Sequence, residues 1–118
     1  MKRNLQEIER ERRRGWIINF LSESAPKPLE ISSLIYLLDA INFPMTSRTL
    51  ARELLFLRNA GLIKIADRDL TQAEATKFLH RYAELGDAAG DGLELSITNR
   101  GIDFQEKRLN VEGVMRIN

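Results

Sequence analysis

The stretch from Thr46 to Ile65 constrains the fold more than any other part of the chain, because it predicts a helix that turns sharply into a strand. Thr46 or Ser47 can accept a hydrogen bond from the free N–H groups in the first turn of a helix. Three leucines then recur on one face of that helix: Leu50, Leu54 and Leu57. Gly61 stands where a left-handed residue commonly ends a helix, and residues 62–65 are typical of a short strand.

Residues 4–22 are expected to form a first helix. Apolar side chains recur there at the i, i+3, i+4 spacing of one buried face, namely Trp16, Ile17, Phe20 and Leu21. No apolar residue lies between Ile8 and Trp16, so the basic stretch 1–14 is expected to project from the body as a helical arm. Gly15 marks a weak point between the two halves of the helix.

A second helix is predicted over residues 29–41, after Pro26 and Pro28 have broken the first one. Its buried side is expected to carry four apolar residues: Leu34, Leu37, Leu38 and Ile41. Asn42 and Pro44 close it before the third helix begins.

Residues 93–97 alternate apolar and polar side chains and are predicted to pair with the strand at 62–65 as a hairpin. The connection between them, residues 66–92, is too long to lack structure of its own. Its stretch from Thr71 to Glu74 has the form of a capping box, which predicts an inserted helix at about 72–85.

A last helix is expected from Asn99 to about Leu109, followed by an irregular tail over 110–118. Three helices followed by a hairpin are the arrangement of a winged helix-turn-helix. The sequence therefore predicts an α+β fold, mainly α, in which one winged-helix domain spans residues 1–118 and residues 66–92 form a helical insertion in the wing.

The composition limits the classes of function. The chain of 118 residues fits one domain, and its lack of cysteine excludes disulfides and thiolate metal sites. It has no apolar run of the roughly 18 residues that would cross a membrane and no signal-peptide pattern, so a cytoplasmic protein without membrane contact is expected. The net charge of +1 means that attraction to phosphate must come from local patches.

The sequence offers little for catalysis, and no catalytic residue, cofactor or metal is expected. His80 is the only histidine and lies within the predicted inserted helix. Asp87, Asp91 and Glu94 lack the spacing of a calcium loop, so a polar turn is the simpler interpretation. The glycines at 86, 90 and 92 precede a strand instead of opening a helix, unlike a phosphate-binding loop.

Several short motifs give the chain a resemblance to a known family: Trp16–Leu21, Thr46–Arg48, Leu57–Leu62, Thr98–Gly101 and Gly113–Arg116. In these motifs it resembles the small winged-helix proteins, similar to ArsR-type regulators, of Mu-like transposable phages and prophages. The resemblance implies a phage or prophage origin and a DNA-binding role in transcription regulation inside the bacterial host cell.

The chain departs from that family pattern in two places. The insertion at 66–92 lengthens the wing, which puts the usual role of the wing in the minor groove in question. The chain also ends at Ile117 and Asn118, where the family pattern has a proline.

The start of the third helix is the main candidate for contact with double-stranded DNA, because a recognition helix presents its N-terminal residues to base edges. The candidate residues are Thr46, Ser47, Arg48, Thr49 and Arg52. Arginine can bind guanine through two hydrogen bonds, and Thr49 could reach a phosphate. The alternative interpretation is an ordinary solvated helix face, and an exposed Phe56 on the same helix would favour a protein interface.

The arm carries a second basic group that could contact the phosphate backbone: Arg10, Arg12, Arg13 and Arg14. Glutamates alternate with these arginines, so a solvated helix is an equal alternative. A third interpretation is that the first and last helices pair two subunits into a homodimer.

Two functions therefore remain open. The first is a sequence-specific DNA-binding regulator, which the capped third helix with Arg48 and Arg52 favours. The second is a winged-helix adaptor that binds a phage or host protein during phage development without binding DNA. The near-neutral charge favours the adaptor, as do the four basic and six acidic side chains of residues 61–92, which would repel DNA.

Overall fold

Helices make up most of the residues that the computed structural model describes, which are residues 4–65, 71–86 and 93–117. With a small antiparallel sheet they form an α+β fold, mainly α, which is compatible with the predicted architecture. The elements in chain order are α1 (Leu5–Ser24), β1 (Leu29–Glu30), α2 (Ile31–Ala40), α3 (Ser47–Asn59), β2 (Ile63–Ile65), α4 (Gln72–Leu85), β3 (Glu94–Ile97) and α6 (Asn99–Gln105).

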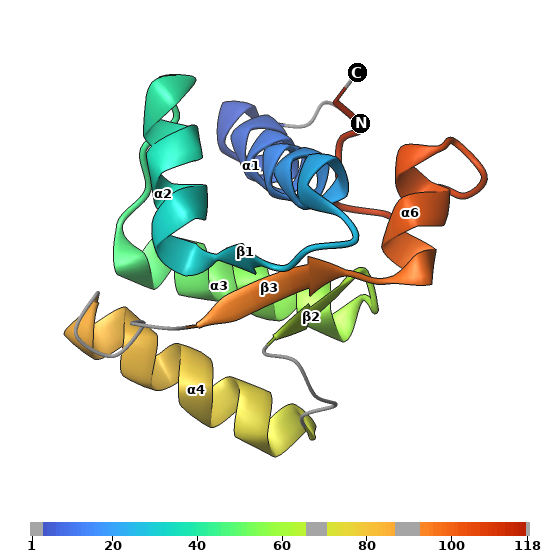
Figure 1. Cartoon of the computed structure of the whole chain (residues 1–118). Helices are drawn as coiled ribbons and strands as arrows, with labels where there is room; N and C mark the ends of the chain where they lie inside the picture. The colour runs from blue at the N-terminus through green and yellow to red at the C-terminus, as the bar shows by residue number, and fades with distance from the viewer. Residues whose placement is uncertain (1–3, 66–70, 87–92, 118) are drawn as a thin grey trace.

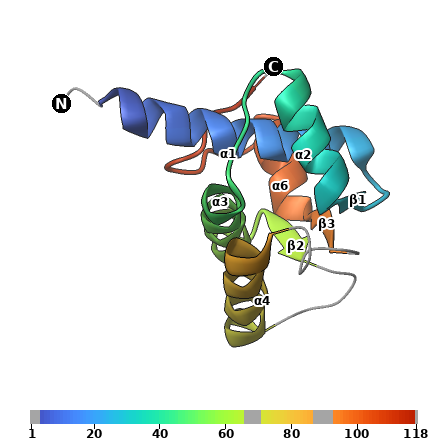
Figure 2. The same ribbon diagram turned by 90° about the vertical axis from the view of Figure 1, so that its left-hand side faces the viewer.

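The helices surround the sheet on several sides. Figure 1 shows α1 and α2 above the sheet, α3 behind it and α4 below it. In the turned view of Figure 2, α3 lies between α1 above and α4 below, with the sheet on a third side. The first turns of α1 extend beyond the body on the remaining side. This side is where α3 is left uncovered.

The sheet has three strands in the order β1-β3-β2. β2 pairs with β3 in antiparallel register, with Ile63 opposite Ile97 and Ile65 opposite Leu95. The predicted pairing of these two strands is therefore confirmed. Leu29 of β1 lies opposite Leu95 on the other edge of β3, and this third strand was not predicted.

Residues 29 and 30 form β1, so their assignment to the first turn of the second helix is wrong. Glu30 has extended backbone and precedes the first residue of α2, and the N–H of Ile31 donates to the carbonyl of Leu93 at 2.9 Å. A strand of two residues has no hydrophobic period of its own. Its conformation depends on β3, which lies far along the chain.

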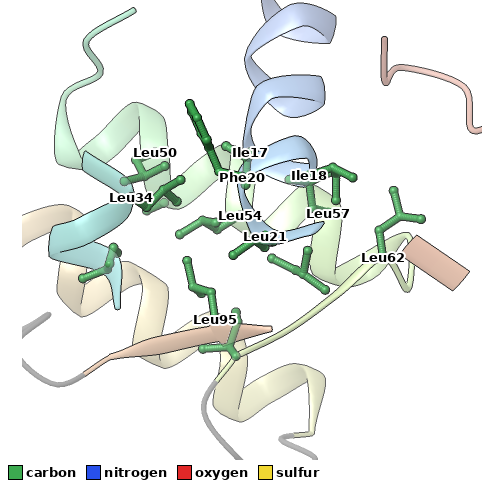
Figure 3. Packing of buried hydrophobic residues seen from close by; sticks show 14 of the residues in the cluster. Ile17, Ile18, Phe20, Leu21, Leu34, Leu50, Leu54, Leu57, Leu62 and Leu95 are labelled. Carbon is green, nitrogen blue, oxygen red and sulfur yellow. The ribbon is translucent and has the colours of Figure 1, made fainter. Parts of the chain in front are cut away.

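The core lies where α1, α2, α3 and the sheet meet (Figure 3). Each of these parts contributes fully buried leucines, among them Leu21, Leu34, Leu54 and Leu95. Burying a side chain of this size stabilises the fold by roughly 1.5–3 kcal/mol. The predicted leucine face of α3 is confirmed, whereas in α2 only Leu34 and Leu38 of the four predicted residues are fully buried.

Gly61 ends the third helix as predicted and holds the next elements in place. Its φ of +77° is a conformation that other residues rarely adopt. Its carbonyl accepts a hydrogen bond from the hydroxyl of Thr98 at 2.6 Å, and Thr98 in turn caps α6. The turn after α3 is thereby fixed to the start of the last helix.

α6 ends at Gln105, earlier than the predicted end near Leu109. Lys107 has a φ of +68°, which ends the helical path. The guanidinium of Arg116 donates to the carbonyls of Phe104 at 2.7 Å and Leu109 at 2.8 Å. The tail thus donates to a carbonyl in the last turn of α6, where carbonyl groups lack a partner within the helix.

The tail has no helix or strand, as expected, but it packs closely against α1. Val114 is buried, and the N–H of Met115 donates to the carbonyl of Glu11 at 3.1 Å. A Cβ at residue 15 would collide with the carbonyl oxygen of Met115. Gly15 is therefore a point of close backbone approach within a helix that continues through it.

α4 covers Gln72–Leu85, as the sequence predicts, and begins with the expected capping box. The hydroxyl of Thr71 accepts from the N–H of Glu74 at 3.2 Å, and the Glu74 carboxylate accepts from the N–H of Thr71 at 3.3 Å. The remaining parts of the predicted insertion, and with them Asp87, Asp91, Gly90 and Gly92, lie outside the described residues.

Candidate nucleic-acid interface

Arg48 and Arg52 lie on the face of α3 that points away from the core. The leucines on the opposite face of the helix are buried, and both arginines are exposed. Being four residues apart, they stand one above the other on the same side of the helix. Within the described ranges, no hydrogen bond or ion pair holds either guanidinium. Two cationic groups are therefore available to a ligand at this surface.

The hydroxyl groups at the start of α3 have structural roles. Thr46 is the N-cap: its hydroxyl accepts from the N–H of Thr49 and donates to the Thr49 hydroxyl, both at 3.1 Å. Ser47 donates to the carbonyl of Ala83 in α4 at 3.3 Å. The hydroxyl protons of Thr46 and Ser47 are therefore used within the protein, unlike the N–H groups of the two arginines, whereas the Thr49 hydroxyl acts here as an acceptor.

The arm does not present its arginines as one patch. Arg12 is exposed, and Arg13 lies 3.8 Å from Glu9, an ion pair one turn away. Arg12 and Arg14 are two residues apart, so they point to nearly opposite sides of the helix. Arg10 lies one turn before Arg14 on the same side of α1, and it is exposed. Of the exposed arginines of the arm, Arg10 therefore points most nearly towards α3.

Arg14, which was predicted to contact DNA, is instead an internal group. Its side chain is 13% exposed, and its Nε donates to the Glu53 carboxylate at 3.2 Å. A second nitrogen donates to the carbonyl of Gly113 at 3.0 Å, and the guanidinium lies 3.6 Å from the centre of the Phe56 ring. One side chain thus joins α1, α3 and the tail.

Glu53 was not identified from the sequence, although it carries this junction. Its carboxylate is fully buried, and only one of its oxygens has a partner among the described residues. The available signal was its position: Glu53 follows Leu50 by three residues and precedes Leu57 by four, so it falls within the leucine face of the helix. Phe56 is partly buried beneath Arg14, so it is not the exposed aromatic side chain that would have favoured a protein interface.

α4 lies along one flank of α3 and makes the most extensive helix contact in the described structure (Figure 2). Between the two helices is a groove of about 270 Å³. Its apolar lining consists of Ala51, Leu55, Leu79 and Ala83. Its charged and polar lining consists of Arg48, Arg52 and His80. The two free arginines therefore stand beside an apolar surface that the sequence analysis did not predict.

A second hollow, of about 380 Å³, lies between the arm and the tail. Its lining includes Arg10 and Arg14 but also Glu7, Glu11 and Glu112. The three acidic side chains outnumber the two basic ones, so this hollow attracts an anion less than the groove beside α3 does.

The part of the chain that the structure describes contains no group of three histidine, cysteine or acidic side chains placed to hold a metal ion. None of the helices in the described ranges is long and apolar enough to cross a membrane. Comparison of the chain with models of protein families, with curated proteins and with solved structures gives no match.

Proposed function

We propose that the chain is a winged-helix protein that binds double-stranded DNA through the exposed face of α3. The observation that carries the proposal is the pair of arginines Arg48 and Arg52, which are exposed, one turn apart and without a partner in the described structure. In this proposal α2 and α3 form the helix-turn-helix, β2 and β3 form the wing, and α4 is a helix inserted into that wing.

The position of α4 limits how α3 meets the duplex. Two packed helices are roughly 20 Å wide, whereas the major groove is roughly 12 Å wide, so both cannot enter it together. α3 would therefore reach the bases through the long side chains at its uncovered edge. α4 would lie over the neighbouring phosphate strand, where its exposed Lys77 and Arg81 would attract phosphate and its exposed Glu74 and Glu84 would oppose it.

The regulatory role, the phage or prophage origin, the cytoplasmic location and the homodimer are parts of the same proposal. The homodimer would pair two subunits through α1 and α6. A dimer would bind a site with two related halves, because the symmetry of the protein is mirrored in its operator.

The test is a selection of duplexes from a random pool by the wild-type protein at moderate salt. Arg48→Ala should relax the preference at one base pair, at a cost of roughly 1–3 kcal/mol. Lys27→Ala is the matched control, because it removes one exposed positive charge from the turn at the other end of α1. A selection that returns no preferred sequence contradicts the proposal.

A second function, a protein-binding adaptor, is favoured by one observation. The groove between α3 and α4 combines an apolar lining with a few polar groups at its edge, which is the usual composition of a binding pocket. If the chain acts only as an adaptor, the selection fails while binding at the groove is retained.

A further inference from the structure

The groove between α3 and α4 combines an apolar lining with a basic rim. Its apolar lining consists of Leu55 and Ala51 from α3 and Leu79 and Ala83 from α4. Leu79 is almost fully buried, whereas Leu55 is half-buried and borders the opening. The alanines keep the space between the helices open, because a larger side chain at Ala83 would fill it.

The ionisable side chains in the described lining of the groove are all basic. Arg48 and Arg52 line it from α3 and are exposed, and His80 lines it from α4 and is also exposed. The described lining includes no carboxylate. An occupant that carries negative charge next to an apolar group would therefore complement both parts of the surface.

The size of the groove limits that occupant. Pockets for cofactors and drug-sized molecules usually measure roughly 300–1,000 Å³ and enclose most of the ligand. This groove measures about 270 Å³ and has walls from only two helices. It has room for one large apolar side chain that enters from a partner while the partner's backbone stays outside, as the central residue of many protein interfaces does.

We propose that this groove binds an acidic peptide segment of a partner protein, inserting one large apolar side chain between Leu55 and Leu79. Carboxylates on either side of that side chain pair with Arg48 and Arg52. Binding of the peptide does not require that the chain binds DNA. A consequence that rests on the proposed function is that the peptide and DNA compete, because both use the same two arginines.

The test uses a short fluorescein-labelled peptide in which one phenylalanine stands between runs of glutamate. Fluorescence anisotropy should show saturable binding to the wild-type chain. A control peptide with serine in place of phenylalanine should bind roughly 10-fold or more weakly, because it loses the burial of the ring. Equal binding of the two peptides would show charge attraction alone and overturn the proposal.

Two substitutions locate the binding to the groove. Leu55→Asn removes apolar surface at the opening, and Ala83→Leu fills the space, so each should weaken the phenylalanine peptide roughly 10-fold. Lys27→Ala should leave its affinity unchanged, and circular dichroism checks that each variant is folded. Wild-type affinity for the peptide in both groove variants would overturn the proposal. Tight binding of free hexanoate, an apolar chain with one carboxylate, without binding of the peptide would also overturn it, because the ligand would then be a small molecule.

A final comparison with a selected duplex distinguishes failure of the peptide proposal from failure of the DNA proposal. Leu55→Asn should lose the peptide and keep the duplex, whereas Arg48→Ala should lose affinity for both. If the peptide binds but no duplex is selected, DNA binding fails and the groove assignment stands. If a duplex binds but the peptide does not, the groove assignment fails and DNA binding stands.

Discussion

The contact between Arg14 and Glu53 shows how one residue can be misjudged from sequence when its partner is distant. Arg14 belongs to a run of arginines, which predicts a solvated basic surface. In the structure its guanidinium pairs with a buried carboxylate on another helix. Nothing in the local sequence indicates this pairing, because the two residues are 39 positions apart. The other arginines of the run have exposed or half-exposed side chains, as predicted.

The first prediction concerns this pair. Arg14→Ala should lower the free energy of unfolding by about 3–5 kcal/mol, because it leaves the Glu53 carboxylate buried without a partner. Urea denaturation measures the change. Arg12→Ala, which removes an exposed arginine from the same helix, should change stability by less than about 0.5 kcal/mol. Similar losses in the two variants would show that the buried pair has no special role.

The second prediction concerns Gly15, where two effects oppose each other. Alanine favours a helix over glycine by roughly 1 kcal/mol. A Cβ at this position, however, would meet the backbone of Met115, which cannot move away cheaply. Gly15→Ala should therefore destabilise the chain by about 1–3 kcal/mol. Thermal unfolding gives the sign of the stability change. In a chain that ends at residue 112, Met115 is absent, so Gly15→Ala should stabilise the protein instead.

At the scale of elements, predictions from local signals agree well with the structure. The caps at Thr46 and Thr71 and the glycine at residue 61 place the ends of α3 and α4 within a residue or two. β1 was not predicted because it depends on β3, far along the chain, and the early end of α6 was not predicted because it depends on the positive φ of Lys107 and on contacts of Arg116 in the tail. The candidate site divides in the same way. The exposure of Arg48 and Arg52 could be predicted from the helical period of α3, whereas the groove could not, because it depends on where α4 packs.

The third prediction belongs to α4. Thr71→Ala removes the hydroxyl that caps this helix, which should cost about 1 kcal/mol of stability. Amide hydrogen exchange in the first turn of α4 should become faster, because those N–H groups lose their acceptor. Unchanged exchange over residues 72–75 would show that the packing against α3 alone holds the helix start.

At the scale of the whole molecule, the charge distribution limits how DNA can be bound. A net charge of +1 gives little long-range attraction to a polyanion, so affinity must come from the few cationic groups at the interface. In the proposed arrangement these groups are the arginines of α3 together with Lys77 and Arg81 of α4 and Arg10 on the arm. Each phosphate that they neutralise adds a salt dependence of roughly −0.9 to the slope of log K against log salt.

The fourth prediction follows from that distribution. Arg10→Ala should make the slope shallower by roughly 1 and weaken binding evenly across sequences, because a phosphate contact carries no sequence information. Titrations of one duplex over a range of salt concentrations give the slope. Lys27→Ala should leave it unchanged, and equal changes in the two variants would point to a general charge effect.

The central claim is that the guanidinium of Arg48, which has no partner in the described structure, recognises a base. The most direct measurement is the affinity of the wild-type chain and of Arg48→Ala for a selected duplex and for a scrambled duplex at the same moderate salt concentration. We expect the wild type to prefer the selected duplex and the variant to lose roughly 5- to 150-fold of that preference, with a smaller change on the scrambled one. An equal loss on both duplexes, or no preference in the wild type, would contradict sequence recognition by α3.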